Sequence, residues 1–137
     1  MHTWHGMPSR SYACMHTCHG VHAQVEAAAL LTPHAIAIVD GERPPLTYAD
    51  VVNDAVLIGG WLVASHAKPG VAVGVFMGHC AELLLVQLGV AMSAAACFNL
   101  ETHFGPAMIS ELLAQTDPIA LVTSDKLAPR LEQASRT

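Results

Sequence analysis

The alternation of apolar strands and helices from residue 21 onward is the feature that most constrains how this chain folds. Val71–Met77 is a nearly continuous apolar run, which is typical of a strand covered on both faces. After it come a helical pattern at Glu82–Met92, a strand at Ala95–Leu100, a helix that begins at Pro106 and a buried strand at Ile119–Thr123. Short links between such elements predict right-handed crossovers. We therefore expect an α/β fold, a partial doubly wound, mostly parallel sheet with flanking helices.

A helix and a hairpin are expected before this sheet. Val21–Leu31 is Ala-rich, and Thr32-Pro33 ends it because a residue before proline avoids the helical region. Ala35–Asp40 and Leu46–Tyr48 flank a turn rich in Gly and Pro, which predicts a hairpin. Thr47-Tyr48-Ala49-Asp50 fits a capping box, in which the Thr hydroxyl accepts from a backbone N–H and the Asp reaches back. The next helix is expected to extend to about His66 with one apolar face, made of Val52, Ala55, Val56, Gly59, Leu62 and Val63.

The charge pattern excludes several classes of partner. Only 12% of the residues are charged, the net charge is −5, and the six Lys and Arg are scattered. A nucleic-acid binder needs a concentrated basic face, and a polybasic membrane anchor is also missing. The charge-free run Leu83–Leu100 contains Gln87, Ser93 and Asn99, so a buried helix followed by a buried strand explains it better than a membrane span. We expect no nucleic-acid partner, no membrane partner and, without an export signal, a cytoplasmic protein with reduced thiols.

The N-terminal residues 1–20 differ from the rest, being rich in His and Met without a clear period, and predict a disordered tail. This tail and its border hold Cys14, Cys18, His19 and His22, whose thiolates and imidazoles could bind Zn²⁺. No second Cys or His pair follows, so incidental metal affinity is the simpler interpretation. A small metal-binding protein stays open as an alternative.

Other candidate chemistry in the sequence is weak. Gly78-His79-Cys80 follows a strand at its carboxyl end, where open α/β sheets bind ligands, and a Cys beside a His can be an activated nucleophile. Adjacent residues seldom face each other correctly, however, and buried Cys is ordinarily inert. No glycine-rich phosphate loop is present. Six carboxylates form no recognisable catalytic pair: Asp40, Asp50, Asp54, Glu82, Glu101 and Glu111.

Residues Val21–Gln133 resemble the beginning of the adenylate-forming (AMP-binding) enzymes, which include acyl-CoA synthetases, nonribosomal peptide synthetase adenylation domains and luciferases. Leu46-Thr47-Tyr48-Ala49-Asp50-Val51 looks like the first core motif, L-T/S-Y-x-E-L. Leu88–Leu100 is similar to the second, L-K-A-G-x-A-Y-V-P-L. Met92-Ser93-Ala94 stands where that motif has Lys-Ala-Gly, and Asn99-Leu100-Glu101 replaces the proline-containing turn. Pro106–Thr123 resembles the helix and strand that follow.

This resemblance implies an ATP- and Mg²⁺-dependent parent enzyme that activates a fatty, aryl or amino acid and transfers it to the thiol of CoA or a carrier protein. In the family, the phosphate-binding loop, the acceptor pocket and the C-terminal lysine lie downstream of the matching region. Residues 21–137 are therefore expected to be an N-terminal subdomain fragment that is completed by the rest of the adenylation domain. We expect no activity of the chain alone, and we assign it no catalytic, cofactor-binding or metal residue. The other alternative is a non-catalytic module that docks through an exposed apolar sheet face.

Overall fold

The computed structural model describes residues 20–137, and the chain divides into two compact units, residues up to Asn53 and residues Asp54–Thr137. Within the described residues, the first helix of the first unit is α2, Val21–Leu31, whose bounds agree with the prediction. Strands β1, Ile36–Ile38, and β2, Leu46–Thr47, pair antiparallel and confirm the hairpin. Helix α3, Tyr48–Ala64, begins in this unit directly after β2.

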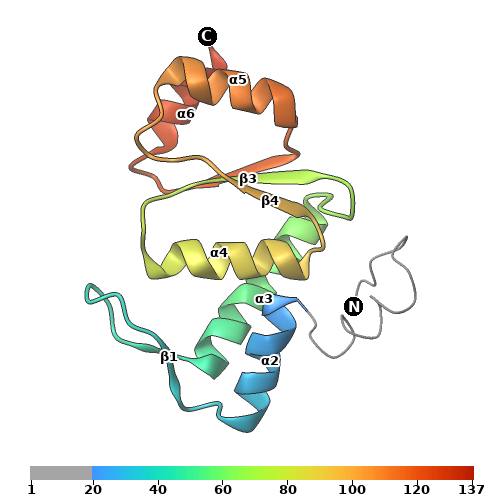
Figure 1. Cartoon of the computed structure of the whole chain (residues 1–137), viewed down its shortest axis with the longest axis vertical. Coiled ribbons are helices and arrows are strands. Elements are labelled where there is room, and N and C mark those ends of the chain that lie inside the picture. The colour runs from blue at the N-terminus through green and yellow to red at the C-terminus, as the bar shows by residue number, and fades with distance from the viewer. Residues whose placement is uncertain (1–19) are drawn as a thin grey trace. The chain divides into compact units, whose positions relative to one another are not determined.

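A parallel sheet of three strands organises the second unit (Figure 1). Strand β3 lies in the centre and pairs in parallel with β4 on one side and β5 on the other. Helix α4 covers one face of the sheet, and α5 and α6 cover the other, as expected of a doubly wound sheet (Figure 1). The elements after α3 are β3 (Ala72–Phe76), α4 (Ala81–Met92), β4 (Ala96–Asn99), α5 (Pro106–Thr116), β5 (Ala120–Thr123) and α6 (Ala128–Ser135).

Two apolar cores lie on the two faces of this sheet. Successive side chains of a strand point to opposite faces of the sheet. Val73 and Val75 of β3 therefore pack in one core, and Phe76 packs in the other. This confirms the prediction that the strand is covered on both faces. Gly74 lies between them, where an added Cβ would be 2.8 Å from the Phe98 ring and would also overlap Leu121. The sheet therefore leaves no room for a side chain at residue 74.

The outer strands are less buried than predicted. Most of β4 is exposed and β5 is only half-buried, so the prediction of two further buried strands is wrong. The reason is topological, since both are edge strands of a three-stranded sheet. The apolar run Leu83–Leu100 does contain a helix followed by a strand, α4 and β4. No helix within residues 20–137 is long and apolar enough to cross a membrane.

The apolar face of α3 also differs from the prediction. Ala55, Gly59 and Leu62 are buried as expected, whereas Val56 and Val63 are exposed. Helix α3 buries the side that packs closely against α4. The approach is close enough that a Cβ added to Gly59 would lie 3.1 Å from the carbonyl oxygen of Gly89. The exposed apolar surface of the second unit thus lies largely on a helix, and the expectation of an exposed sheet face is not met at β3.

Candidate functional site

Three loops meet at the carboxyl edge of the parallel sheet, and this edge is the candidate site. They span residues 77–80 after β3, 100–105 after β4 and 124–127 after β5. The first leads to α4 on one face of the sheet, and the other two lead to α5 and α6 on the opposite face (Figure 1). Open α/β sheets bind ligands where neighbouring connections diverge in this way. The position is therefore the one where the topology favours a ligand.

The loop after β3 carries the Gly78-His79-Cys80 sequence. His79 is exposed, and Cys80 is the N-cap of α4 in extended conformation. The Cys80 thiol donates a hydrogen bond of 3.3 Å to the carbonyl oxygen of Gly78. That bond is not the thiol–imidazole contact that an activated Cys nucleophile requires. The geometry gives no support to a nucleophilic role for Cys80.

Arg130 of α6 holds the loop after β4. Its two terminal guanidinium nitrogens donate hydrogen bonds of 2.6 and 2.7 Å to the carbonyl oxygens of Thr102 and Phe104. The guanidinium carbon also lies 5.2 Å from the centre of the Phe76 ring, within cation–π range. The sequence analysis did not single out Arg130. Its partners are backbone carbonyls more than twenty residues away, and such contacts leave no sequence signal.

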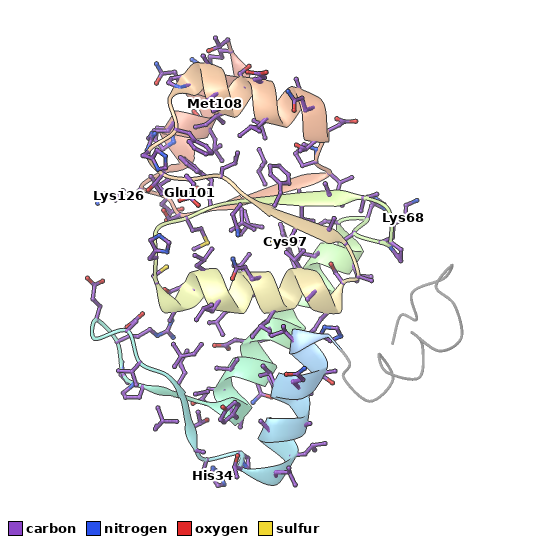
Figure 2. The ribbon with its side chains drawn as sticks, in the orientation of Figure 1. His34, Lys68, Cys97, Glu101, Met108 and Lys126 are labelled. Atoms are coloured by element: carbon purple, nitrogen blue, oxygen red, sulfur yellow. The ribbon has the colours of Figure 1, made fainter. Side chains whose placement is uncertain are left out.

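The carboxyl end of β5 is attached to the central strand by a side chain as well as by sheet pairing. The Thr123 hydroxyl donates a hydrogen bond of 2.7 Å to the carbonyl oxygen of Phe76, a contact that sequence reasoning also missed. Figure 2 shows Glu101 and Lys126 on the carboxyl edge and Lys68 at the opposite edge of the sheet. Glu101 and Lys126 are exposed charges. The carboxyl edge is thus polar. Hydrogen bonds from Arg130 and Thr123 hold it together, and its charged side chains Glu101 and Lys126 are exposed to solvent.

The six carboxylates that were considered for acid–base chemistry are distributed over both units. Asp50 completes the capping box, since its carboxylate accepts from the Thr47 N–H at 2.9 Å while the Thr47 hydroxyl accepts from the Asp50 N–H at 3.2 Å. The Thr47 N–H, and next its hydroxyl, hold the pKa of the Asp50 carboxyl below its ordinary value. The Asp40 carboxylate accepts from two N–H groups of its own turn, and Glu111 accepts from the Gln115 amide. These three carboxylates have structural roles.

The described residues do not form a metal site or a nucleotide-binding loop. Cys14, Cys18 and His19 lie outside residues 20–137, as does nearly all of the predicted tail, and His22 is half-buried on α2. Within residues 20–137, no three His, Cys, Asp or Glu side chains are placed to bind a metal ion. The carboxyl edge has only isolated glycines, Gly78 and Gly105, rather than a glycine-rich cradle. The described residues therefore do not fit ATP or Mg²⁺.

Residues 25–137 match the model of the protein family described as AMP-binding enzyme. Nonribosomal peptide synthetase dtxS1 from Metarhizium robertsii is 29% identical over 94 residues, which is 69% of this chain and 1% of that protein. Nonribosomal peptide synthetase sidN from Epichloe festucae is 31% identical over 121 residues, which is 81% of this chain and 3% of that protein. The chain therefore spans a very small share of the curated relatives it matches.

Solved structures of similar fold include the anthranilate CoA ligase AuaEII in complex with anthranoyl-AMP, with a TM-score of 0.79 at 19% identity. That match covers 84% of this chain and 22% of the ligase chain. The nonribosomal peptide synthetase FmoA3 bound to α-methyl-L-serine-AMP gives a TM-score of 0.76 at 25% identity. It covers 81% of this chain and 12% of that structure. In both cases most of the similar protein lies outside the matched region.

Proposed function

The chain belongs to the AMP-binding enzyme family, and we propose that it forms the N-terminal scaffold of an enzyme that adenylates a carboxylate with ATP and passes the acyl group to a thiol. One observation carries this proposal: the family match extends from residue 25 to residue 137 and so includes every element of the second unit.

The two core motifs have architectural positions, which supports a scaffold role. The first motif supplies the capping box that starts α3. The second spans the end of α4, the turn at Ser93–Ala95 and strand β4. The carboxyl edge of the sheet carries no acid pair or phosphate cradle among the described residues. Nucleotide binding and the chemical step are therefore assigned to the part of the enzyme beyond the matched region.

The substrate class is proposed from the relatives. The matched curated proteins reported above are peptide synthetases by name, and the solved structures hold an aryl and an amino acyl adenylate. A carboxylic acid, with amino and aryl acids as the first classes to test, is the substrate we propose. CoA or a carrier-protein thiol would accept the acyl group. A cytoplasmic location, where ATP is available, belongs to the same proposal.

The test joins the full 137-residue chain to the stretch that follows the matched region in the peptide synthetase sidN. Pyrophosphate release from ATP is measured for this fusion over a panel of amino, aryl and fatty acids. We expect carboxylate-dependent release from the fusion, and none from the 137-residue chain alone or from the downstream stretch alone. A folded fusion without release contradicts the proposal. Release by the chain alone also contradicts it, because a nucleotide site would then exist within these residues.

A further inference from the structure

Helix α3 contains no charged residue between Ala55 and Ala64, although one of its sides is already buried. On that side Ala55, Gly59 and Leu62 are buried and face α4 and the sheet. A helix packed on one side normally presents charged and polar groups on the other. The opposite side of α3 therefore needs a separate explanation.

That opposite side is apolar and exposed, with Val56 at 53%, Leu57 at 72%, Trp61 at 59% and Val63 at 55% exposure. We call these four residues the α3 apolar face. Gly60 lies among them with nothing within 4 Å of an added Cβ, so the face has space around its middle. A helix that is apolar on both sides is typical of one buried on both sides. We therefore expect the α3 apolar face to be covered in the functional protein.

A lipid surface does not fit this face. A helix that lies in a membrane interface combines its apolar side with a polar side rich in Lys and Arg. Helix α3 has neither Lys nor Arg, and its other side is buried by α4. The net charge of −5 would also be repelled by anionic lipids. The occupant is thus a protein surface.

The size of the face favours a covalently linked occupant over a second copy. Four side chains exposed by about half to three-quarters offer on the order of 400 Å², whereas a stable association of separate proteins buries about 800 Å² per partner. A linked segment needs far less area, because linkage raises its effective concentration. The similar structures carry such polypeptide, since this chain covers only 22% of the ligase AuaEII.

We propose that the α3 apolar face is the docking surface for an apolar segment of the AMP-binding enzyme that follows the matched region. This inference rests on the proposed function, because the occupant belongs to the rest of that enzyme. Docking would fix the scaffold to the part that binds the nucleotide. Trp61, as the largest exposed side chain of the face, would be its central contact.

The first test compares Trp61→Glu in the full chain and in the fusion described above. In the chain alone we expect little change in the unfolding temperature, because residue 61 is solvated there. In the fusion we expect a fall of about 5–10 °C, because the carboxylate would be buried without a partner. Met108→Glu on α5 is the matched control, since Met108 is 48% exposed and lies on another helix (Figure 2). An equal effect of Trp61→Glu in both proteins, or an equal effect of both substitutions in the fusion, would overturn the proposal.

The second test labels the protein with 5-fluorotryptophan in a Trp4→Phe background, and a Trp61→Phe variant identifies the Trp61 signal by fluorine NMR. We expect Trp61 to be accessible to a soluble quencher in the chain alone and protected in the fusion. An accessible Trp61 in the fusion overturns docking, even if pyrophosphate is released. A protected Trp61 without pyrophosphate release supports docking and contradicts the proposed function. A dimer of the chain alone that Trp61→Glu dissociates would identify a second copy instead, and an insoluble fusion counts against both proposals.

Discussion

Within residues 20–137, three residues other than glycine adopt positive φ: His66 at 72°, Ala94 at 62° and Asp117 at 42°. Each lies just after a helix, α3, α4 or α5, where the left-handed conformation lets the N–H groups bond to the last turn. Asp tolerates this region, but alanine is destabilised by the clash of its Cβ with the following carbonyl. Ala94 stands where the second core motif has glycine. The backbone conformation thus explains the glycine of the motif and makes Ala94 a strained position.

Replacing Ala94 with glycine should therefore stabilise the protein. The left-handed conformation costs alanine roughly 1–2 kcal/mol, and the greater freedom of glycine in the unfolded chain offsets part of that gain. We expect the free energy of unfolding to rise by about 0.5–1 kcal/mol. Denaturation in urea measures it, with Ala95→Gly as the control, because Ala95 has no positive φ and should lose stability. A loss of stability in Ala94→Gly would contradict this account of the turn.

The capping box at Thr47 and Asp50 predicts both a mutational effect and a pH dependence. Thr47→Ala removes the hydroxyl that accepts from the Asp50 N–H and should cost about 1 kcal/mol. The Asp50 carboxyl has a lowered pKa in the folded state, so its contribution is complete above the unfolded pKa of about 3.9 and is lost as the pH falls through the folded pKa. Thermal unfolding between pH 6 and pH 2.5 should show the advantage of the wild type over Asp50→Asn shrinking toward acid pH. A constant difference would mean that the carboxylate charge contributes nothing.

At the scale of elements, the crossing of α3 and α4 depends on two glycines. Gly59 approaches the Gly89 carbonyl, and a Cβ on Gly89 would be 2.8 Å from the Ile58 Cβ and 3.2 Å from the Ala55 carbonyl oxygen. The contact involves backbone and a β-branched side chain, which cannot move aside at low cost. Small residues at these positions therefore set the distance between the two helices.

Two Gly→Ala substitutions separate this packing from helix propensity. Gly89→Ala should lower the free energy of unfolding by about 1–3 kcal/mol, because the helices must move apart. Gly60 is also in α3, but a Cβ added there meets nothing within 4 Å. Because alanine favours the helix more than glycine does, Gly60→Ala should raise the free energy of unfolding by up to about 1 kcal/mol. Chemical denaturation of both variants gives the comparison. A stabilising Gly89→Ala would show that α3 and α4 are not in close contact in solution.

Sequence patterns predicted these elements well because periodicity and helix-ending residues are local signals. The capping box, the Pro at the start of α5 and the limits of α2 all follow from neighbouring residues. Burial was predicted less well. Whether β4 is an edge strand, or whether Val56 faces solvent, depends on which elements lie beside it, and an apolar side chain alone does not reveal that.

At the scale of the whole molecule, the sequence located the candidate edge but not the contacts that build it. Alternating strands and helices predicted a parallel sheet and placed His79 and Cys80 at its carboxyl end. The clamp by Arg130 and the bond from Thr123 to Phe76 join segments 26 to 47 residues apart. The sequence does not reveal which carbonyl oxygens will accept a hydrogen bond from Arg130, because any carbonyl can accept one. The fold decides which carbonyls lie within reach. For this reason the assembled site could not be derived from residue types.

The two compact units should also differ in local stability. Strand β3 is almost fully buried at the centre of the second unit, whereas α2 in the first unit has no buried residue. Amide groups of segments with little buried apolar surface exchange through local opening, while those of a core strand require global unfolding. Hydrogen exchange followed by mass spectrometry should show α2 exchanging about a hundredfold faster than β3, or more. Similar protection of both segments would contradict the difference in burial.

A substitution in β3, with a control in the loop that follows the strand, tests whether this protection depends on the core around the strand. In Gly74→Ala the new Cβ would overlap Phe98 and Leu121, so we expect a loss of about 1–3 kcal/mol in unfolding free energy. The β3 amides should then exchange faster in proportion, because they report global unfolding of the second unit, while α2, which already opens locally, should exchange as before. Gly78→Ala meets nothing within 4 Å and should leave both segments unchanged. If Gly74→Ala accelerated exchange in α2 as strongly as in β3, the two units would unfold as one, and the stability of α2 would derive from the sheet rather than from its own turns.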